Sequence, residues 1–324
     1  MASMTALAVD LAPGAKRSLV LPNPVMVASG TFGYGVEFAK VFDIQRLGAI
    51  VTKTTTLRPR RGNPPVRIAE TPGGMLNSIG LQNIGVAALL RDLAPAYATW
   101  RVPVVVSIMG FSAPEYAEVA SRLEGVEGFS GVELNLSCPN TERGGIEFGQ
   151  EPAAAADVVR RVLRVTTLPV IAKLTPNVAD PREVARAVVE AGAQALCVAN
   201  TLQAMAMDVE GRRAVIGTTF AGLSGPAVKP VALRQVYQVA GVVDVPVIGC
   251  GGIATAADAL EYILAGATAV QVGTATFANP LAPLEVLEGI ERYCGEHGVE
   301  DIGELIGAGR PFDRLRAGRA ASTP

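Results

Sequence analysis

The segment Pro169-Val-Ile-Ala-Lys-Leu174 is a short apolar run, and a second run, Ala195-Leu-Cys-Val-Ala-Asn200, follows an amphipathic stretch over Pro181–Ala191. Neither run alternates apolar with polar residues, which is typical of parallel strands covered on both faces. The stretch between them opens with Asp180-Pro181, which suits a first helical turn. This segment therefore predicts a strand–helix–strand unit with parallel strands.

The same unit recurs along the whole chain. Eight apolar runs alternate with helical patterns at even spacing, and no charged linker divides them. The pattern favours a closed (β/α)8 barrel over an open doubly wound sheet. The predicted strands are Pro24–Ser29, Ala49–Thr54, Pro103–Met109, Gly131–Ser137, Pro169–Leu174, Ala195–Asn200, Val245–Gly249 and Ala269–Gly273, and the clearest further helices are Pro152–Val165, Val228–Ala240 and Ala256–Leu264.

We expect a single domain over residues 1–309 of the 324, followed by a flexible Arg-rich tail over residues 310–324. Met1–Val20 is expected to form a short lead-in hairpin under the barrel. Two connections are long, Thr55–Leu81 and Thr201–Ala227, and long loops in compact domains are usually functional. Both follow barrel strands, so they belong to the C-terminal face, where ligands bind.

Composition excludes several classes of protein. Hydrophobic residues make up 49%, enough for a sizeable core, and the net charge of −2 argues against a nucleic-acid binder. The uncharged stretch Tyr262–Leu284 is broken by Gly, Asn and Pro, so no membrane span is expected. The N-terminus lacks the pattern of a signal peptide, so we expect a cytoplasmic protein. The four cysteines have no Cys-x-x-Cys spacing, so neither a metal site nor an iron–sulfur cluster is expected within this chain.

Polar residues at the predicted strand ends indicate the site. Two of the five lysines, Lys53 and Lys173, lie in apolar strands. A buried ammonium needs an anionic partner, which we expect ligands to supply. Strands seven and eight end in glycines at Gly249–Gly252 and Gly273, which suits a phosphate held by backbone N–H groups. Gly249–Ala254 also fits G-x-G-x-x-A, but no acidic residue ends the next strand, so a mononucleotide is the better interpretation.

The motif Asn135-Leu-Ser-Cys-Pro-Asn140 places Cys138 just beyond a strand end, before the Gly-containing loop Thr141–Gly149. Its polar neighbours fit a buried structural cysteine poorly, whereas Cys197, Cys250 and Cys294 fit that role. The sole histidine, His297, is expected to be a solvated residue at a helix end. A thiolate is therefore the plausible general base.

Four features together resemble the dihydroorotate dehydrogenase family: Asn77-Ser-Ile-Gly-Leu-Gln-Asn83, Asn135–Asn140, Gly222-Leu-Ser-Gly-Pro-Ala227 and the glycine-rich strand ends. They occur in family order from about Asn23 to Pro280. The resemblance implies FMN as cofactor and oxidation of (S)-dihydroorotate to orotate in pyrimidine (UMP) biosynthesis. Cys138 would be the catalytic base.

The resemblance also implies roles for individual residues. FMN would be contacted by Ser29, Lys53, Thr54, Asn135, Lys173, Ala199 through its backbone, Gly225, Gly251, Gly252, Gly273 and Thr274. Ser107 stands where this class usually has Asn, so its contact with FMN departs from the pattern. Substrate would be held by Lys53, Asn77, Ser78, Ile79, Gly80, Leu81, Asn135, Asn200 and Thr201.

The subtype resembles class 1B, the catalytic subunit of an NAD-linked heterotetramer built on a homodimer. Gly144-Gly145 after the cysteine loop, Gly80–Asn83 and Gly222–Ala227 support it. Cysteine at 138 and the lack of an N-terminal amphipathic extension argue against the membrane-bound class 2. FAD and a [2Fe–2S] centre are expected only on a partner subunit, since this chain offers no second nucleotide domain.

Three alternatives remain open from the sequence. One is class 1A, the fumarate-linked homodimer. Another is a phosphate-binding barrel lyase or isomerase in which Lys173 forms a Schiff base. The third is a barrel that stores flavin without catalysis.

Overall fold

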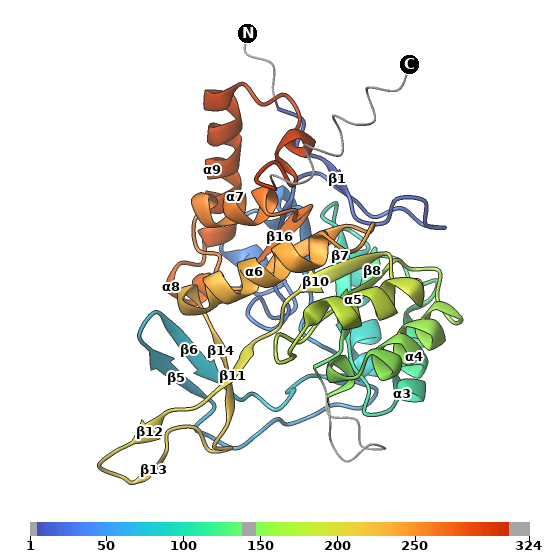
Figure 1. Cartoon of the computed structure of the whole chain (residues 1–324). Helices are drawn as coiled ribbons and strands as arrows, with labels where there is room; N and C mark the ends of the chain where they lie inside the picture. Colours follow the sequence, from blue (N-terminus) through green and yellow to red (C-terminus); the bar gives the residue numbers. More distant parts are fainter. Residues whose placement is uncertain (1–4, 138–146, 311–324) are drawn as a thin grey trace.

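The computed structural model describes residues 5–137 and 147–310. Eight parallel strands close into a barrel in the order β10-β15-β16-β3-β4-β7-β8-β9, which confirms the predicted (β/α)8 fold (Figure 1). Each lies within or next to one of the eight predicted runs. The barrel strands are β3 (Val25–Val27), β4 (Ala49–Val51), β7 (Val104–Ile108), β8 (Gly131–Asn135), β9 (Val170–Lys173), β10 (Ala195–Val198), β15 (Val247–Cys250) and β16 (Ala269–Val272).

Burial on both faces explains why these strands lack alternation. All five residues of β7 are buried, as are all four of β9. The register is parallel throughout and sets Asn135 of β8 opposite Lys173 of β9, with Cys197 of β10 on the other side of Lys173. Residues far apart in the sequence therefore meet inside the barrel.

Helices surround the barrel, and the four predicted ones are present within two residues of their expected ends. In α5 the side chain of Asp180 accepts from Arg182 N and Pro181 occupies the first turn, as its sequence predicts. The helices are α1 (Gly85–Ala88), α2 (Ala94–Tyr97), α3 (Ala113–Leu123), α4 (Pro152–Leu163), α5 (Pro181–Glu190), α6 (Lys229–Ala240), α7 (Ala256–Leu264), α8 (Ala275–Ala278) and α9 (Ala282–His297), with a π-helical turn at Leu89–Leu93 and 3-10 turns at Phe38–Lys40, Ile44–Arg46, Phe148–Gln150, Pro226–Val228 and Ile302–Leu305.

The expected N-terminal hairpin is present as β1 (Val9–Asp10) and β2 (Val20–Leu21), which pair antiparallel. Its Leu19 side chain lies 3.4 Å from the position that a Cβ at Gly131 would take. Gly131 is the first residue of β8, so the hairpin covers the end of the barrel opposite the strand carboxyl ends.

The two long connections contain strands that the sequence analysis did not predict. They form a four-stranded antiparallel sheet, β11-β14-β6-β5, beside the barrel, with the hairpin β12–β13 projecting beyond it (Figure 1). A small core of Leu76, Ile216 and Ala221 holds this sheet together. The strands are β5 (Ile68–Thr71), β6 (Gly74–Asn77), β11 (Leu202–Ala204), β12 (Met207–Asp208), β13 (Arg213–Ala214) and β14 (Ala221–Ser224).

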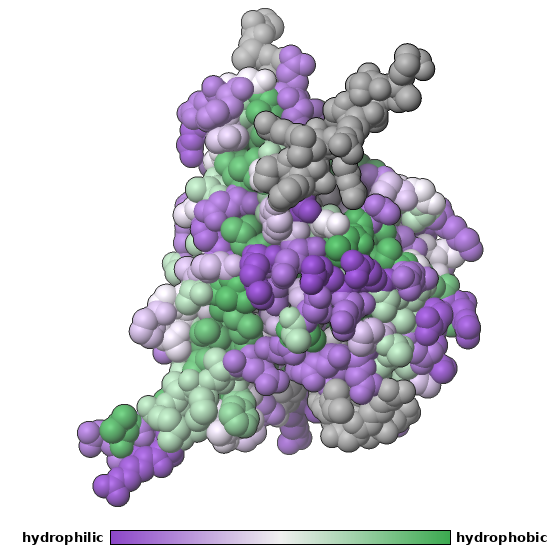
Figure 2. All heavy atoms as spheres, in the orientation of Figure 1, coloured by the Kyte–Doolittle hydropathy of each residue, from purple (hydrophilic) through white to green (hydrophobic). Residues whose placement is uncertain are grey.

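Hydrophobic residues gather around this small sheet at the lower left of the molecule (Figure 2). The large exposed ones include Met205, Met207, Val209 and Phe220. No helix among the described residues is both long and apolar enough to cross a membrane.

Arg310, assigned to the flexible tail from sequence, packs against the barrel helices. Its guanidinium lies 4.5 Å from the centroid of the Tyr237 ring and donates to the backbone oxygens of Tyr237 and Ala265, at 2.6 and 3.1 Å. The rest of the expected tail, residues 311–324, lies outside the described residues.

Replacing Arg310 with Ala should lower the free energy of unfolding by about 1–3 kcal/mol, because it removes charge-assisted hydrogen bonds and a cation–π contact. Urea unfolding followed by circular dichroism measures the change. Arg292→Ala, on the exposed face of α9, is the matched control and should have little effect. Equal stability of the two variants would contradict an anchoring role for Arg310.

Candidate active site

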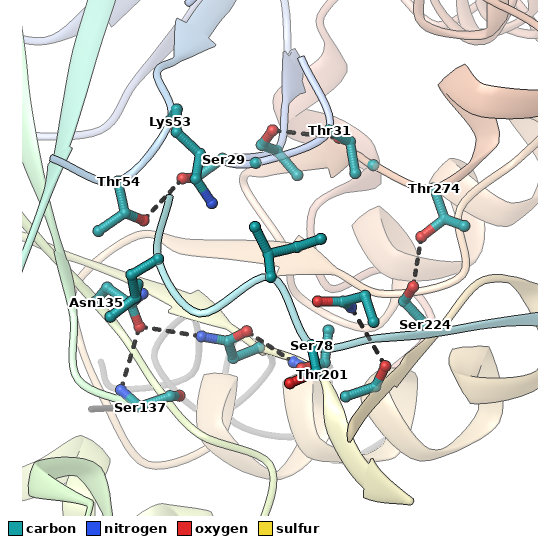
Figure 3. Close-up of a pocket in the computed structure, with 18 of the residues that line it drawn as sticks. Ser29, Thr31, Lys53, Thr54, Ser78, Asn135, Ser137, Thr201, Ser224 and Thr274 are labelled. Carbon is teal, nitrogen blue, oxygen red and sulfur yellow. Dashed lines mark hydrogen bonds between the residues drawn. The ribbon is translucent and has the colours of Figure 1, made fainter. Parts of the chain in front are cut away.

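A large cavity of about 980 Å³ opens at the carboxyl ends of the barrel strands, between the barrel and the small sheet. Its floor is formed by residues that follow β3 and β4 and by the last residues of β8 and β9, and one wall is formed by the loops after β15 and β16. Residues of β6, β11 and β14 form the opposite wall. Figure 3 shows polar side chains from these elements pointing toward a common space.

A chain of hydroxyl groups lies on one side of the floor. Ser29 Oγ is 3.1 Å from Thr54 Oγ1, which is 2.9 Å from Ser107 Oγ. These residues follow or belong to three adjacent strands, so the barrel register brings them together. Ser107 is fully buried, and its hydroxyl is engaged by Thr54.

Asparagine amides occupy the next part of the floor. Asn135 Oδ1 accepts from Asn200 Nδ2 at 3.1 Å and from Ser137 N at 3.2 Å (Figure 3). The Tyr116 hydroxyl donates to Asn135 O at 2.5 Å and so fixes its backbone. Asn200 Oδ1 accepts from Thr201 N at 2.9 Å. This network fixes the side-chain amides at the strand ends before any ligand binds.

Lys173 is buried beneath these amides, and its surroundings correct one expectation. Its Nζ donates to Gln271 Oε1 at 3.0 Å and lies 3.8 Å from Glu133 Oε1. An anionic partner for this ammonium is therefore part of the chain itself and does not have to come from a ligand. Sequence reasoning missed this because it recognised the lysine in an apolar strand but not the glutamate in β8.

Lys53 differs from Lys173. It is half-buried on the cavity wall, and burial lowers its pKa. None of the ion pairs formed by the described residues involves Lys53. Its ammonium can therefore meet an anionic ligand in the cavity.

Glycines line the wall formed by the loops after β15 and β16. Gly251 has φ +136° and Gly252 has φ +70°, and a Cβ at Gly252 would lie 2.8 Å from Lys229 N and 2.9 Å from Gly225 O. The Tyr262 hydroxyl donates to Gly251 O at 2.6 Å and holds the turn in place. These positions require glycine both for backbone conformation and for close approach.

The backbone N–H groups of this wall are available to a ligand. Those of Gly251, Gly252, Gly273 and Thr274 meet no acceptor within residues 5–137 and 147–310. Thr274 Oγ1 is 2.8 Å from Ser224 Oγ across the gap between barrel and small sheet (Figure 3). A concave group of unpaired amides is suited to a phosphate.

The small sheet supplies the remaining wall. Asn77 Nδ2 donates to Gly222 O at 3.2 Å, and Ser78 Oγ accepts from Asn63 Nδ2 at 2.9 Å. After Ser78 the chain turns through Gly80 and Leu81, with φ of 70° and 59°. This turn presents Ser78–Leu81 to the cavity, although a positive φ is uncommon for leucine.

The cavity brings together nearly all the residues singled out from sequence. Lining it are Ser29, Lys53, Thr54, Asn77, Ser78, Ile79, Gly80, Leu81, Ser107, Asn135, Lys173, Ala199, Asn200, Thr201, Gly251, Gly252, Gly273 and Thr274. Gly225 is not among the lining residues, and its carbonyl oxygen lies 2.9 Å from the position that a Cβ at Gly252 would take. Cys138 lies outside the described residues, as does Gly144-Gly145.

Other lining residues were not anticipated. Asn177, which follows β9, donates to Thr201 O at 3.2 Å and accepts from Gln203 N at 2.9 Å, so it ties two loops together. Because Asn177 is a polar residue shortly after a barrel strand, the sequence could have indicated that it lines the cavity. Glu133 was signalled by its charge within an apolar run. Ser224 gave no comparable signal, because its place on the wall depends on the small sheet.

The other cysteines and the histidine occupy the places expected from sequence. Cys197, Cys250 and Cys294 are buried free thiols. His297 is exposed at the end of α9, with its ring nitrogen 2.9 Å from Tyr293 O. Within the described parts of the chain, no group of three or more His, Cys, Asp or Glu residues could hold a metal ion.

Comparison with known proteins agrees with this geometry. The family described as Dihydroorotate dehydrogenase matches residues 17–293. The chain belongs to the dihydroorotate dehydrogenase family. A protein of Desulforudis audaxviator named "Dihydroorotate dehydrogenase B (NAD(+)), catalytic subunit" is 57% identical over 290 residues, covering 90% of this chain and 94% of that protein.

Two further relatives carry the same name. The protein of Trichlorobacter lovleyi is 55% identical over 291 residues, covering 90% of this chain and 96% of its own length. That of Geotalea uraniireducens is 54% identical over 288 residues, covering 89% and 94%. The similarity spans the barrel and the small sheet of this dihydroorotate dehydrogenase family member, so it includes every wall of the cavity.

Replacing Gly252 with Ala should lower the free energy of unfolding by at least about 1–2 kcal/mol, because an L-residue is strained at this positive φ and its Cβ would meet backbone atoms. Urea unfolding measures the effect. Gly295→Ala is the matched control, since its Cβ would meet open space in α9, where Ala should stabilise the helix by about 0.5–1 kcal/mol. Parental stability of the Gly252 variant would show that the turn tolerates a side chain.

Proposed function

We propose that this chain oxidises (S)-dihydroorotate to orotate in pyrimidine biosynthesis, in the cytoplasm, as the catalytic subunit of a class 1B enzyme. The observation that carries the proposal is one cavity that combines an amide-lined anion cradle, two lysines and a cluster of asparagines. The family to which the chain belongs and the names of its relatives indicate which reaction these residues would serve.

The residues present fit FMN. The backbone amides of Gly251, Gly252, Gly273 and Thr274, which meet no acceptor among the described residues, would hold its phosphate. Ser29, Thr54 and Ser107 offer hydroxyl groups and Asn135 an amide, while Ala199 would contribute its backbone and Gly225 would support the cradle. The Lys173 ammonium would stabilise negative charge on the reduced ring. When bound, FMN supplies the acceptor for the hydride that leaves C6 of the substrate.

The asparagines suit the substrate ring. Asn77, Asn135 and Asn200 each both donate and accept, which matches the alternating C=O and N–H edge of a dihydropyrimidine. Lys53 has no ion-pair partner among the described residues, so it can pair with the substrate carboxylate. Thr201 and the turn Ser78–Leu81, including Ile79 and Gly80, would enclose the ring and exclude water.

A base must take the proton from C5. The only histidine, His297, is exposed on α9 and does not line the cavity. Asn135 and Ser137 of the Asn135–Asn140 motif line the cavity, and Cys138 is the residue of that motif whose conjugate base can accept a proton near neutral pH. We therefore assign the proton to Cys138 Sγ on the basis of the sequence motif.

The two electrons taken from dihydroorotate must pass from the reduced flavin to a further acceptor. The relatives' names specify NAD(+) and a catalytic subunit, which supports class 1B and a second subunit. FAD and a [2Fe–2S] centre would belong to that subunit, docked on a homodimer of this chain. The exposed apolar residues around the small sheet, close to the cavity, support a protein-contact role for that side of the molecule.

Replacing Cys138 with Ala should leave FMN binding intact but slow reduction of the flavin by dihydroorotate about 10²–10⁴-fold, because the general base is lost. Cys138→Ser should retain part of the rate, with its pH profile moved upward, since an alcohol is a weaker acid than a thiol. Anaerobic stopped-flow bleaching across pH measures both. Bleaching of the Ala variant at the parental rate would exclude Cys138 as the base.

Steady-state assays with three acceptors test the function as a whole. The purified chain, loaded with FMN, should be bleached by dihydroorotate and should reduce ferricyanide but not NAD⁺ at a useful rate. Adding the partner subunit should restore NAD⁺ reduction. Efficient NAD⁺ reduction by the chain alone would contradict the electron relay, efficient fumarate reduction would indicate class 1A, and a chain that dihydroorotate does not bleach would contradict the proposed reaction.

A further inference from the structure

A cluster of buried polar side chains lies inside the barrel at the base of the cavity. Its members come from five strands: Glu133 of β8, Lys173 of β9, Cys197 of β10, Cys250 of β15 and Gln271 of β16. Glu133 has no exposed surface. A buried carboxylate is costly unless it is compensated, so its retention calls for a physical explanation.

The hydrogen bonds of this cluster have a fixed direction. Gln271 Nε2 donates to Glu133 Oε2 at 2.7 Å, and Gln271 Oε1 accepts from Lys173 Nζ at 3.0 Å. A carboxylate can only accept, so Glu133 forces the NH₂ end of the amide toward itself and the oxygen toward Lys173. The Cys197 thiol donates to the same oxygen at 3.4 Å. By fixing the orientation of the Gln271 amide, Glu133 directs Gln271 Oε1 toward Lys173 Nζ.

The cluster also balances charge. Glu133 Oε1 lies 3.8 Å from Lys173 Nζ, close enough for electrostatic attraction but too far for a good hydrogen bond. This oxygen has no hydrogen-bond partner among the described residues. Burial alone would lower the pKa of Lys173. The neighbouring Cys197, Cys250 and Glu133 raise it by more, so the pKa of Lys173 lies above its ordinary value. Burial raises the pKa of Cys197, whereas the neighbouring Cys197 thiol lowers the pKa of Cys250 to about 7. Glu133 is the one carboxylate among these neighbours.

We propose that Glu133 is a positioning residue that, through Gln271, holds the Lys173 side chain at the base of the cavity and keeps it an ammonium. This rests on the proposed function, since the ammonium would act on bound FMN. The Glu133 side chain has no exposed surface, and its charge lies beside Lys173 Nζ. Its effect is therefore on the potential of the flavin and is transmitted by the lysine.

Glu133→Gln tests the proposal because it removes the charge while keeping an acceptor for Gln271. A buried lysine without its counterion loses its proton at high pH, so the reduced flavin loses its stabilising cation. At about pH 9 the affinity for reduced over oxidised FMN should fall about tenfold, which is about 30 mV for a two-electron couple. The difference should shrink toward about pH 6, where Lys173 regains its proton. Anaerobic titration of the FMN-loaded protein against a reference dye measures the potential.

Three variants show whether the effect passes through Lys173. Glu133→Asp keeps the charge and should recover part of the potential. In a Lys173→Met background, Glu133→Gln should cause no further fall. Glu118→Gln, in an exposed pair with Arg122 on α3, is the matched control and should keep the parental potential.

A parental or raised potential in Glu133→Gln would overturn the proposal, including the case in which the Cys250 thiolate replaces the carboxylate. If that variant does not fold, Gln271→Met interrupts the connection while keeping both charges and should also lower the potential, and an unchanged value there would overturn the proposal. Failure of the parental chain to bind FMN would refute the proposed function instead, and would be visible in its spectrum before any variant is compared.

Discussion

The parallel pairing of β8 with β9 is the contact on which the site depends. Its register sets Asn135 opposite Lys173, and the next strand, β10, adds Cys197 beside the same lysine. A shift of one residue would reverse which side chains face the barrel interior. The amide pair Asn135–Asn200 and the ion pair of Lys173 with Glu133 both require this register. Packing of the barrel and assembly of the site are therefore determined by the same backbone hydrogen bonds.

The cavity divides into regions of different chemistry because the strands around it end differently. After β15 and β16 the chain turns through glycines and leaves backbone amides open toward the cavity. After β8 and β10 it ends in asparagines. A ligand that carries a phosphate at one end and a heteroaromatic ring at the other can contact both regions at once.

The small sheet is an addition to the eight strands and surrounding helices of the barrel. It is assembled from two connections more than a hundred residues apart, with Leu223 of β14 paired to Leu76 of β6 and to Leu202 of β11. Contacts such as Thr274 with Ser224 join it to the barrel across the cavity mouth. Few buried residues hold this sheet together, and apolar side chains remain exposed at its outer edge.

The sequence by itself determined the barrel and most residues of the cavity. Continuous apolar runs such as Pro169–Leu174 are explained only by strands buried on both faces, and in a barrel all polar residues at strand ends meet on one side. Local patterns also identified the helix start at Asp180-Pro181 and the glycine turn at Gly251-Gly252. These features are encoded within a few residues, so they can be recognised without knowing what lies nearby in space.

Only the tertiary structure decided the rest. The strands of the small sheet, such as Gly74–Asn77 and Ala221–Ser224, are short, rich in small residues and stabilised by each other, so neither has a period of its own. Likewise, Lys173 stood out in its strand, but its partner Glu133 lies 40 residues away and Gln271 almost 100, and no local pattern links them. Pairing between distant segments is set by the closure of the barrel. The sequence therefore led us to expect a ligand as the anionic partner of Lys173, whereas Glu133 of the same chain is its counterion.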